Sequence, residues 1–266
     1  MILIKVGGGP ALNWDGIARD VAELQRTVPI VLVHGANALR NDLAARLGIP
    51  VRTVVSPSGI TSVYTDQEAL DVFLMAYAGL ANKRLVACLQ RHGVNAVGLS
   101  GVDGRLWEAK AKKDLLVRDN GKTKLLRDNL TGRVRKANAG LIRLLLDHGY
   151  TPVMSAPAIS DENEIVNTDN DGAAAVMAAA LGVKTMIFLF EAAGLLRDPE
   201  QPESLISRLP RAEIEAAMIY AKGRMQKKIL AVKQAFESGV SEIRLGDGRG
   251  EHPVRDALAG RGTLIQ

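Results

Sequence analysis

The stretch Ile2-Leu3-Ile4-Lys5-Val6-Gly7-Gly8-Gly9 decides the fold. Its apolar residues predict a buried β-strand that ends in a glycine-rich turn. Glycines directly after a strand let the backbone approach an anion, and the N-terminus of the next helix presents unpaired N–H groups. Lys5 interrupts the apolar run, and a lysine at the carboxyl end of a central strand should point into the active-site crevice. The alternative is an edge-strand lysine that faces solvent.

The same order of strand, glycine and helix recurs in Leu32-Val33-His34-Gly35-Ala36-Asn37, and apolar strands alternate with helical patterns along the chain. Near-continuous apolar strands between helices indicate a mostly parallel sheet that is covered on both faces. We therefore expect an α/β fold, a three-layer α/β/α sandwich. The predicted strands are residues 2–6, 29–34, 95–99, 151–154, 184–190 and 242–245, and the predicted helices are residues 14–26, 36–47, 67–92, 138–148, 171–181, 213–220 and 225–238.

Length and composition exclude several classes of protein. With 266 residues, the chain forms one large domain or two lobes. It has no uninterrupted run of about 18 or more apolar residues, so we expect no membrane span and no signal peptide, and its one cysteine, Cys88, excludes an internal disulfide. These features predict a reduced, cytoplasmic protein. Neither glycine turn matches a Walker A loop or a dinucleotide-binding motif, and the histidines lack the spacing of a zinc site.

Basic residues are concentrated in residues 105–136, which hold eleven bases and four acids, a net charge of +7. The other 23 bases and 25 acids of the chain sum to −2. Inside this stretch, Asp119-Asn120-Gly121-Lys122 is typical of a hairpin turn between short strands at 115–117 and 123–126. A basic β-hairpin of this density attracts a large anionic partner, although it could also be merely solvated. Nucleic acid is disfavoured as the partner because Trp107 is the only aromatic residue in the stretch.

Two polar clusters open predicted helices. Asn167-Thr168-Asp169-Asn170-Asp171 precedes an Ala-rich helix and holds more polar groups than one helix cap needs. In Gly223-Arg224-Met225-Gln226-Lys227-Lys228, adjacent lysines lie at a helix start, where cations oppose the helix dipole. A bound phosphate would explain those lysines, and a solvated face is the alternative.

These motifs, in this order, resemble the amino acid kinase family, and most closely its branches that act on N-acetylglutamate and on 2-aminoadipate linked to a carrier protein. The resemblance implies one continuous domain, with residues 1–165 as the lobe that binds the carboxylate substrate and residues 166–266 as the lobe that binds ATP. It rests on Lys5-Val6-Gly7-Gly8, Val33-His34-Gly35, Ala81-Asn82-Lys83-Arg84-Leu85, residues 97–104, Asn167-Thr168-Asp169-x-Asp171, Gly223-x-Met225-x-x-Lys228 and Gly262-Thr263-Leu264-Ile265.

The family transfers the γ-phosphoryl group of ATP to a carboxylate, giving an acyl phosphate. By resemblance, Lys5 and Lys228 hold the phosphates, and Asp171 orients both lysines. Mg²⁺ travels with ATP, so the protein itself provides no metal site. The resemblance further assigns backbone N–H groups for phosphate to Gly7, Gly8 and Gly35, the surroundings of the nucleotide to Phe190, Gly194, Tyr220 and Gly223, and the amino-acid substrate to Ala36, Val63 and Asn167.

In the carrier-dependent branch, a small acidic amino-group carrier protein holds the substrate. The hairpin would then be its docking surface, and the activity would weaken with salt. Family members are commonly homodimers, and residues 67–92 are the expected interface because they carry more apolar residues than one helix stripe needs. The residues expected to dock the carrier are Lys110, Lys112, Lys113, Arg118, Lys122 and Lys124.

The chain departs from the family pattern at three places. Ala36 replaces a glycine, where its methyl group could crowd the phosphoryl group, and Val63 occupies the position of an arginine that binds the substrate α-carboxylate. Glu191 and the two alanines after it replace the usual Asp or Asn. Two alternatives therefore stay open: a kinase for free N-acetylglutamate, and a catalytically impaired sensor of nucleotide or ligand.

Overall fold

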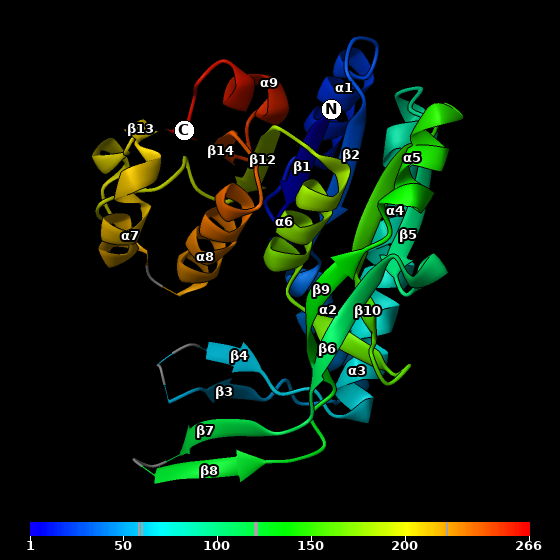
Figure 1. The fold of residues 1–266 in the computed structure, drawn as a ribbon, viewed down its shortest axis with the longest axis vertical. Helices are drawn as coiled ribbons and strands as arrows, with labels where there is room; N and C mark the ends of the chain where they lie inside the picture. Colours follow the sequence, from blue (N-terminus) through cyan, green and yellow to red (C-terminus); the bar gives the residue numbers. More distant parts are fainter. Residues whose placement is uncertain (58, 60, 120–121, 222) are drawn as a thin grey trace.

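The computed structural model describes the whole chain except residues 58, 60, 120–121 and 222. Strand β1 (Ile2–Val6) lies in the middle of the main sheet, parallel to β2 (Ile30–His34) on one side and to β12 (Thr185–Phe190) on the other (Figure 1). Residues 2–6, which open the chain, thus form the central strand of the fold. The sheet order is β11 (Ile165–Thr168), β9 (Thr131–Ala137), β6 (Trp107–Lys112), β10 (Thr151–Ser160), β2, β1, β12, β14 (Glu242–Asp247), β15 (Thr263–Ile265) and β13 (Arg208–Leu209), with β5 (Ala96–Gly101) beside β10.

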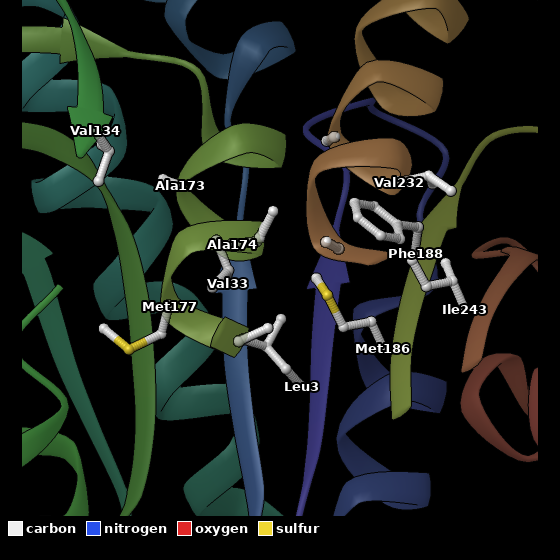
Figure 2. Close-up of a cluster of buried hydrophobic side chains, with 14 of the residues drawn as sticks. Leu3, Val33, Val134, Ala173, Ala174, Met177, Met186, Phe188, Val232 and Ile243 are labelled. Carbon is white, nitrogen blue, oxygen red and sulfur yellow. The ribbon is translucent and has the colours of Figure 1, made fainter. Parts of the chain in front are cut away.

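Alternate residues of the central strands enter two separate cores. Leu3 and Phe188 face one side of the sheet, where they pack with α6 (Asn170–Leu181) and α8 (Arg224–Glu237), as Figure 2 shows. Ile4 faces the other side and packs with α1 (Trp14–Leu24), α4 (Asn82–Arg91) and α9 (Pro253–Leu258). Helix α5 (Ala139–Asp147) contributes Ile142 to the first core. The predicted three-layer α/β/α sandwich with a mostly parallel sheet is confirmed.

The helix predicted at residues 67–92 is one helical run that changes type. It consists of α3 (Gln67–Leu74), a π-helical segment, Met75–Ala81, and α4. Most of the apolar residues that suggested a dimer interface, including Phe73 and Leu85, are buried inside the chain, so that argument for an interface is wrong. The run Gln67–Arg91 is long and apolar enough to cross a membrane by length and composition alone, a test that the core helices of soluble proteins also pass.

Two other elements differ from the sequence prediction. The strand predicted at residues 151–154 continues to Ser160 as β10. The helix predicted at residues 213–220 is divided into three short pieces, with only Ile214–Ala217 as α-helix α7. Its two ends tighten to 3-10 geometry, as short helices commonly do.

The basic stretch forms the predicted hairpin, with β7 (Leu115–Asp119) antiparallel to β8 (Lys122–Leu126). The Asn120-Gly121 part of the predicted turn lies outside the described residues. A second hairpin, β3 (Thr53–Val55) and β4 (Thr61–Val63), was not predicted, and it pairs with β7. The four strands β4-β3-β7-β8, here called the hairpin sheet, project from the main body below α2 (Asn37–Leu47) and β6 (Figure 1).

Candidate active site

Three elements bring Lys5, Asp171 and Lys228 together. Lys5 has the same strand parity as Leu3, so its side chain points to the face covered by α6 and α8. Its Nζ forms an ion pair with one carboxylate oxygen of Asp171, in the first turn of α6. The other oxygen accepts a hydrogen bond from Lys228 Nζ of α8, at 3.1 Å. The carboxylate thus holds both lysines in the arrangement that the sequence predicted.

The cluster is buried, which sets its charge states. Lys5 and Asp171 are each 5% exposed. Burial alone would raise the pKa of Asp171, but the ammonium groups of Lys5 and Lys228 hold that pKa well below its usual range. Burial lowers the pKa of Lys5, and Asp171 offsets part of that shift. One carboxylate between two lysines leaves the cluster with an excess of positive charge, as phosphate binding requires.

Two glycine turns lie against each other beside this cluster: the turn after β1, with Gly7 and Gly8, and the turn after β2, with Gly35. A Cβ on Gly8 would lie 2.5 Å from Ala36 N and 2.8 Å from Gly35 C, so only glycine fits. The N–H groups of Gly7 and Gly35 donate to the carbonyls of Leu189 (2.8 Å) and Val6 (2.9 Å). The expectation that these two N–H groups serve phosphate is therefore corrected, since they continue the sheet. Among the described residues, Gly8 N–H has no backbone acceptor.

Near the cluster and the glycine turns, helices α2 and α8 begin without a side-chain cap. Helices α1, α3, α5 and α6 each begin with an Asn or Asp side chain that accepts a backbone N–H. The N-cap residues of α2 and α8 are Ala36 and Gly223, which provide no such acceptor. The first N–H groups of both helices therefore suit an anion.

Among the residues that the structure describes, no group of three His, Cys, Asp or Glu side chains is placed to hold a metal ion. The donors gathered here are ammonium and N–H groups, which bind phosphate and not a cation. These groups suit the phosphates of an anionic ligand.

The residues expected around the nucleotide have different surroundings. Phe190 ends β12, and its ring centroid lies 5.3 Å from Lys228 Nζ. Gly223 opens α8 with a φ of 55° and open space where a Cβ would be. Tyr220, just before it, packs partly on the core. Gly194 is packed closely, because a Cβ there would lie 2.6 Å from Thr263 Oγ1, so its contribution is to loop packing.

Glu191 is a site residue that the sequence argument treated only as a departure. Its Oε1 accepts the backbone N–H of Ala11 at 2.6 Å, and its carboxylate lies against Gly9, where any Cβ would overlap it. Glu191 therefore connects the turn after β12 to the turn after β1. A glutamate is long enough to make this connection, which a pattern of residue types along the chain does not reveal.

His34 belongs to a buried network that the sequence did not indicate. Asn82 Nδ2 donates to His34 Nε2 at 3.1 Å and to the Val153 carbonyl at 3.0 Å. His34 Nδ1 can then donate to the Gly35 carbonyl, 3.2 Å away. Burial lowers the pKa of His34 to about 4, so the ring is neutral at pH 7. This network holds the turn after β2, which contains Gly35, in position.

The residues expected to bind the amino-acid substrate are separated into two places. Val63 and Asn167 line one pocket beside α2 and α3. Asn167 Nδ2 donates to Thr65 Oγ1 at 3.0 Å in the same pocket. Ala36 is 4% exposed and belongs to the core on the α6 face, so the expected crowding of a phosphoryl group by its methyl is not supported.

The basic residues expected to dock a carrier do not all lie on one face. Lys113 is paired with Glu162 and, at 3.2 Å, with Glu164, which neutralise its charge locally. Within the hairpin sheet, Lys124 lies opposite Val117, and Arg118 opposite Thr123, so the two cations point to opposite faces. Lys110 and Lys112 lie on β6 of the main sheet, and Lys122 begins β8.

The chain belongs to the amino acid kinase family, whose family model matches residues 1–247. It is an ATP-dependent phosphotransferase of that family. It is 46% identical to the [LysW]-aminoadipate kinase of Deinococcus radiodurans, over all of this chain and 91% of the relative. It is 41% identical, over the full length of both, to the [LysW]-aminoadipate kinase of Thermus thermophilus. A putative [LysW]-aminoadipate/[LysW]-glutamate kinase of Nitrosopumilus maritimus is 38% identical over 97% of this chain and 96% of the relative.

Solved structures share the fold at low sequence identity. N-acetylglutamate synthase from Neisseria gonorrhoeae matches 99% of this chain and 58% of its own, with a TM-score of 0.79 and 23% identity. Giardia carbamate kinase matches 99% of this chain and 97% of its own, with a TM-score of 0.68 and 15% identity. These similarities establish the architecture of the sheet and its helices.

Proposed function

We propose that this enzyme phosphorylates the side-chain carboxylate of 2-aminoadipate, or of glutamate, while the amino group of the substrate is linked to a small acidic carrier protein. The relatives named above support this substrate class. The observation that carries the proposal is the hairpin sheet. One of its faces carries Arg118 beside exposed apolar side chains, and it includes Val63, which lines the pocket beside α2.

The pairing register defines that face. Arg118 lies opposite Val55 on β3, and Leu116 lies opposite Leu125 on β8, so these four side chains share one face. Val55, Leu116 and Leu125 are 37%, 56% and 48% exposed, respectively. Val63, which pairs with Thr53, is on the same face and lines the pocket. Exposed apolar side chains beside an arginine are typical of a protein-binding surface.

In the proposed reaction, a carboxylate oxygen of the substrate attacks the γ-phosphorus of ATP, and the bond to the bridging oxygen breaks to release ADP. Lys5 and Lys228 would neutralise the phosphate oxygens, while Asp171 fixes the positions of both ammonium groups. Gly8 N–H and the uncapped starts of α2 and α8 would add further donors. Phosphoryl transfer needs this positioning and charge neutralisation and little covalent chemistry from the protein.

Several finer assignments belong to the same proposal. Mg²⁺ would be held by the nucleotide phosphates, residues 1–165 would bind the carboxylate substrate, and residues 166–266 would bind ATP. We expect a cytoplasmic homodimer. The alternative of a free N-acetylglutamate kinase in arginine biosynthesis is not favoured by the relatives named above. The intact Lys5–Asp171–Lys228 cluster argues against an impaired sensor.

The proposal is tested by trapping acyl phosphate with hydroxylamine in the presence of Mg-ATP. The substrates are carrier-linked 2-aminoadipate, carrier-linked glutamate and free N-acetylglutamate. We expect turnover of the carrier-linked substrates only, and a loss of at least about tenfold in kcat/KM in the double variant Leu116→Asp/Arg118→Glu. Lys136→Glu is the matched control, because Lys136 belongs to the same basic stretch but lies on β9. Equal turnover of free N-acetylglutamate would refute the proposal.

A further inference from the structure

The pocket beside α2 contains a charged residue that the sequence argument did not assign. Its wall is mostly apolar and includes Val63 and Phe73. Thr65 and Asn167 add polar groups, and Arg40 of α2 is the one charged side chain among the lining residues that the structure describes. An apolar pocket with a few converging polar groups is typical of a small-ligand site.

Arg40 is largely buried at this wall. It is 9% exposed, and its backbone N–H donates to the Ala36 carbonyl at 2.8 Å, one helical turn back. Its Nε donates to Asn41 Oδ1 at 3.1 Å. A guanidinium stays protonated even when it is buried, so the pocket has a permanent positive charge on one side. Such a group binds a carboxylate through two parallel hydrogen bonds.

The polar part of the pocket wall is fixed by hydrogen bonds. Asn167 Nδ2 donates to Thr65 Oγ1, and the Thr65 carbonyl accepts the N–H of Leu130 at 2.7 Å. The Thr65 N–H donates to the buried Asn129 side chain at 3.3 Å. A ligand that enters would therefore meet polar groups whose positions are already set, which lowers the entropy cost of binding.

The distance between Arg40 and the glycine turns suits an acidic amino acid. Four residues of helix separate Ala36 from Arg40, a rise of about 6 Å. The two carboxyl groups of glutamate or 2-aminoadipate are separated by four or five carbon–carbon bonds of about 1.5 Å, roughly 5–6 Å when extended. If the reacting carboxylate lies at the glycine turns and the substrate extends along α2, its α-carboxylate reaches the position of Arg40 along that helix.

We propose that Arg40 binds the α-carboxylate of the amino-acid substrate. Val63, in the same pocket, offers no charge, so Arg40 supplies the cation that an α-carboxylate needs there. The enzyme would then select carrier-linked amino acids that have an α-carboxylate over amines that lack one. This inference rests on the proposed function and adds a residue that determines specificity.

The test compares two loaded carriers in the hydroxylamine assay. One carries 2-aminoadipate, and the other carries 5-aminopentanoate, which has the same distal carboxylate but no α-carboxylate. We expect the wild-type enzyme to prefer the first by about 10–100-fold in kcat/KM, the range expected for a charge-assisted hydrogen bond. Arg40→Gln should lose that preference by slowing the first substrate only, and Arg40→Lys should keep part of it. Arg46→Gln, an exposed arginine paired with Asp42 on the same helix, is the matched control and should keep the full preference.

The preference is a ratio measured within one variant, so a partly unfolded variant lowers both rates and leaves the ratio interpretable. An unchanged preference in Arg40→Gln would refute the role of Arg40 while the proposed function stands. Equal losses on both carriers would assign Arg40 a structural role and also refute the inference. A wild-type enzyme that turns over neither carrier would refute the proposed function, and this inference with it.

Discussion

The Lys5–Asp171–Lys228 cluster and the hairpin sheet both carry excess positive charge, but the two regions use it differently. In the cluster, Lys5 and Asp171 are buried and Lys228 is partly buried, and each contacts a specific partner from another element of the fold. In the hairpin sheet, the charges are exposed and point to both faces. Buried charges interact strongly because little water screens them, whereas exposed charges act together and weaken with salt. Single substitutions should therefore have large effects in the first region and small ones in the second.

The largest effect is expected for Asp171→Asn. Without the carboxylate, two ammonium groups repel each other in a buried site, and neither is held in position. We expect kcat to fall by about 10²–10³-fold, measured as acyl phosphate formation at saturating substrate. Asp169→Asn is the control, because Asn caps α6 as well as Asp, and it should lose less than about tenfold. A folded Asp171→Asn enzyme with wild-type kcat would contradict the proposed role of the cluster.

Gly8→Ala should have the next largest effect. The added methyl would meet the backbone of Gly35 and Ala36, which cannot move aside as a flexible side chain can. We expect a loss of about 1–3 kcal/mol in the free energy of unfolding and at least about tenfold in kcat. Gly79→Ala is the control, since its Cβ would meet only Leu74 O at 3.7 Å, and it should be neutral or slightly stabilising. A fully active and stable Gly8→Ala enzyme would show that the glycine turns lie further apart.

His34 makes the stability of the fold sensitive to acid. Its pKa is about 4 in the folded protein, against an ordinary value of 6.5, because burial disfavours the charged ring. The unfolded chain therefore binds a proton first, so this stabilisation is complete above pH 6.5 and is lost as the pH falls toward 4. We expect the free energy of unfolding to fall by about 2 kcal/mol between pH 7 and 5 from this residue alone.

Denaturant unfolding at pH 7 and 5 measures the effect of His34. The variant His34→Gln should show a correspondingly weaker dependence on pH, because glutamine does not titrate. His148→Gln, at an exposed histidine, should keep the wild-type dependence. Identical pH dependence in His34→Gln and the wild type would mean that the fold does not lower the pKa of this ring.

The smallest effects are expected for single charges around the hairpin sheet. Arg118→Gln should raise KM for the loaded carrier by about three- to tenfold at 0.05 M salt, and the difference should disappear near 0.5 M. Lys113→Gln should change KM by less than about twofold, because Glu162 and Glu164 already neutralise that lysine. Equal effects of the two variants would mean that binding of the carrier depends on the total charge of the basic stretch and not on contact with the face that includes Arg118.

Lys5 and Lys228 could be selected as candidate site residues because each lies in a strongly patterned segment. Lys5 interrupts an apolar strand before glycines, and Lys228 lies at the start of a helix where a cation is unfavourable without an anion. Arg40 and Glu191 carried no such signal. Arg40 lies within an ordinary helical pattern, and its importance comes from Val63 and Asn167, which reach the same pocket from distant parts of the chain.

The sequence by itself determined the alternation of strands and helices, the mostly parallel sheet, the family and the concentration of basic charge, because these follow from residue types at short spacing. Only the tertiary structure decided the pairing of β3 with β7, the two faces of the hairpin sheet, the neutralisation of Lys113 and the pocket around Arg40. Those features depend on contacts between residues far apart in the chain. Strand register and side-chain direction set such contacts, and the local pattern of residues leaves them open.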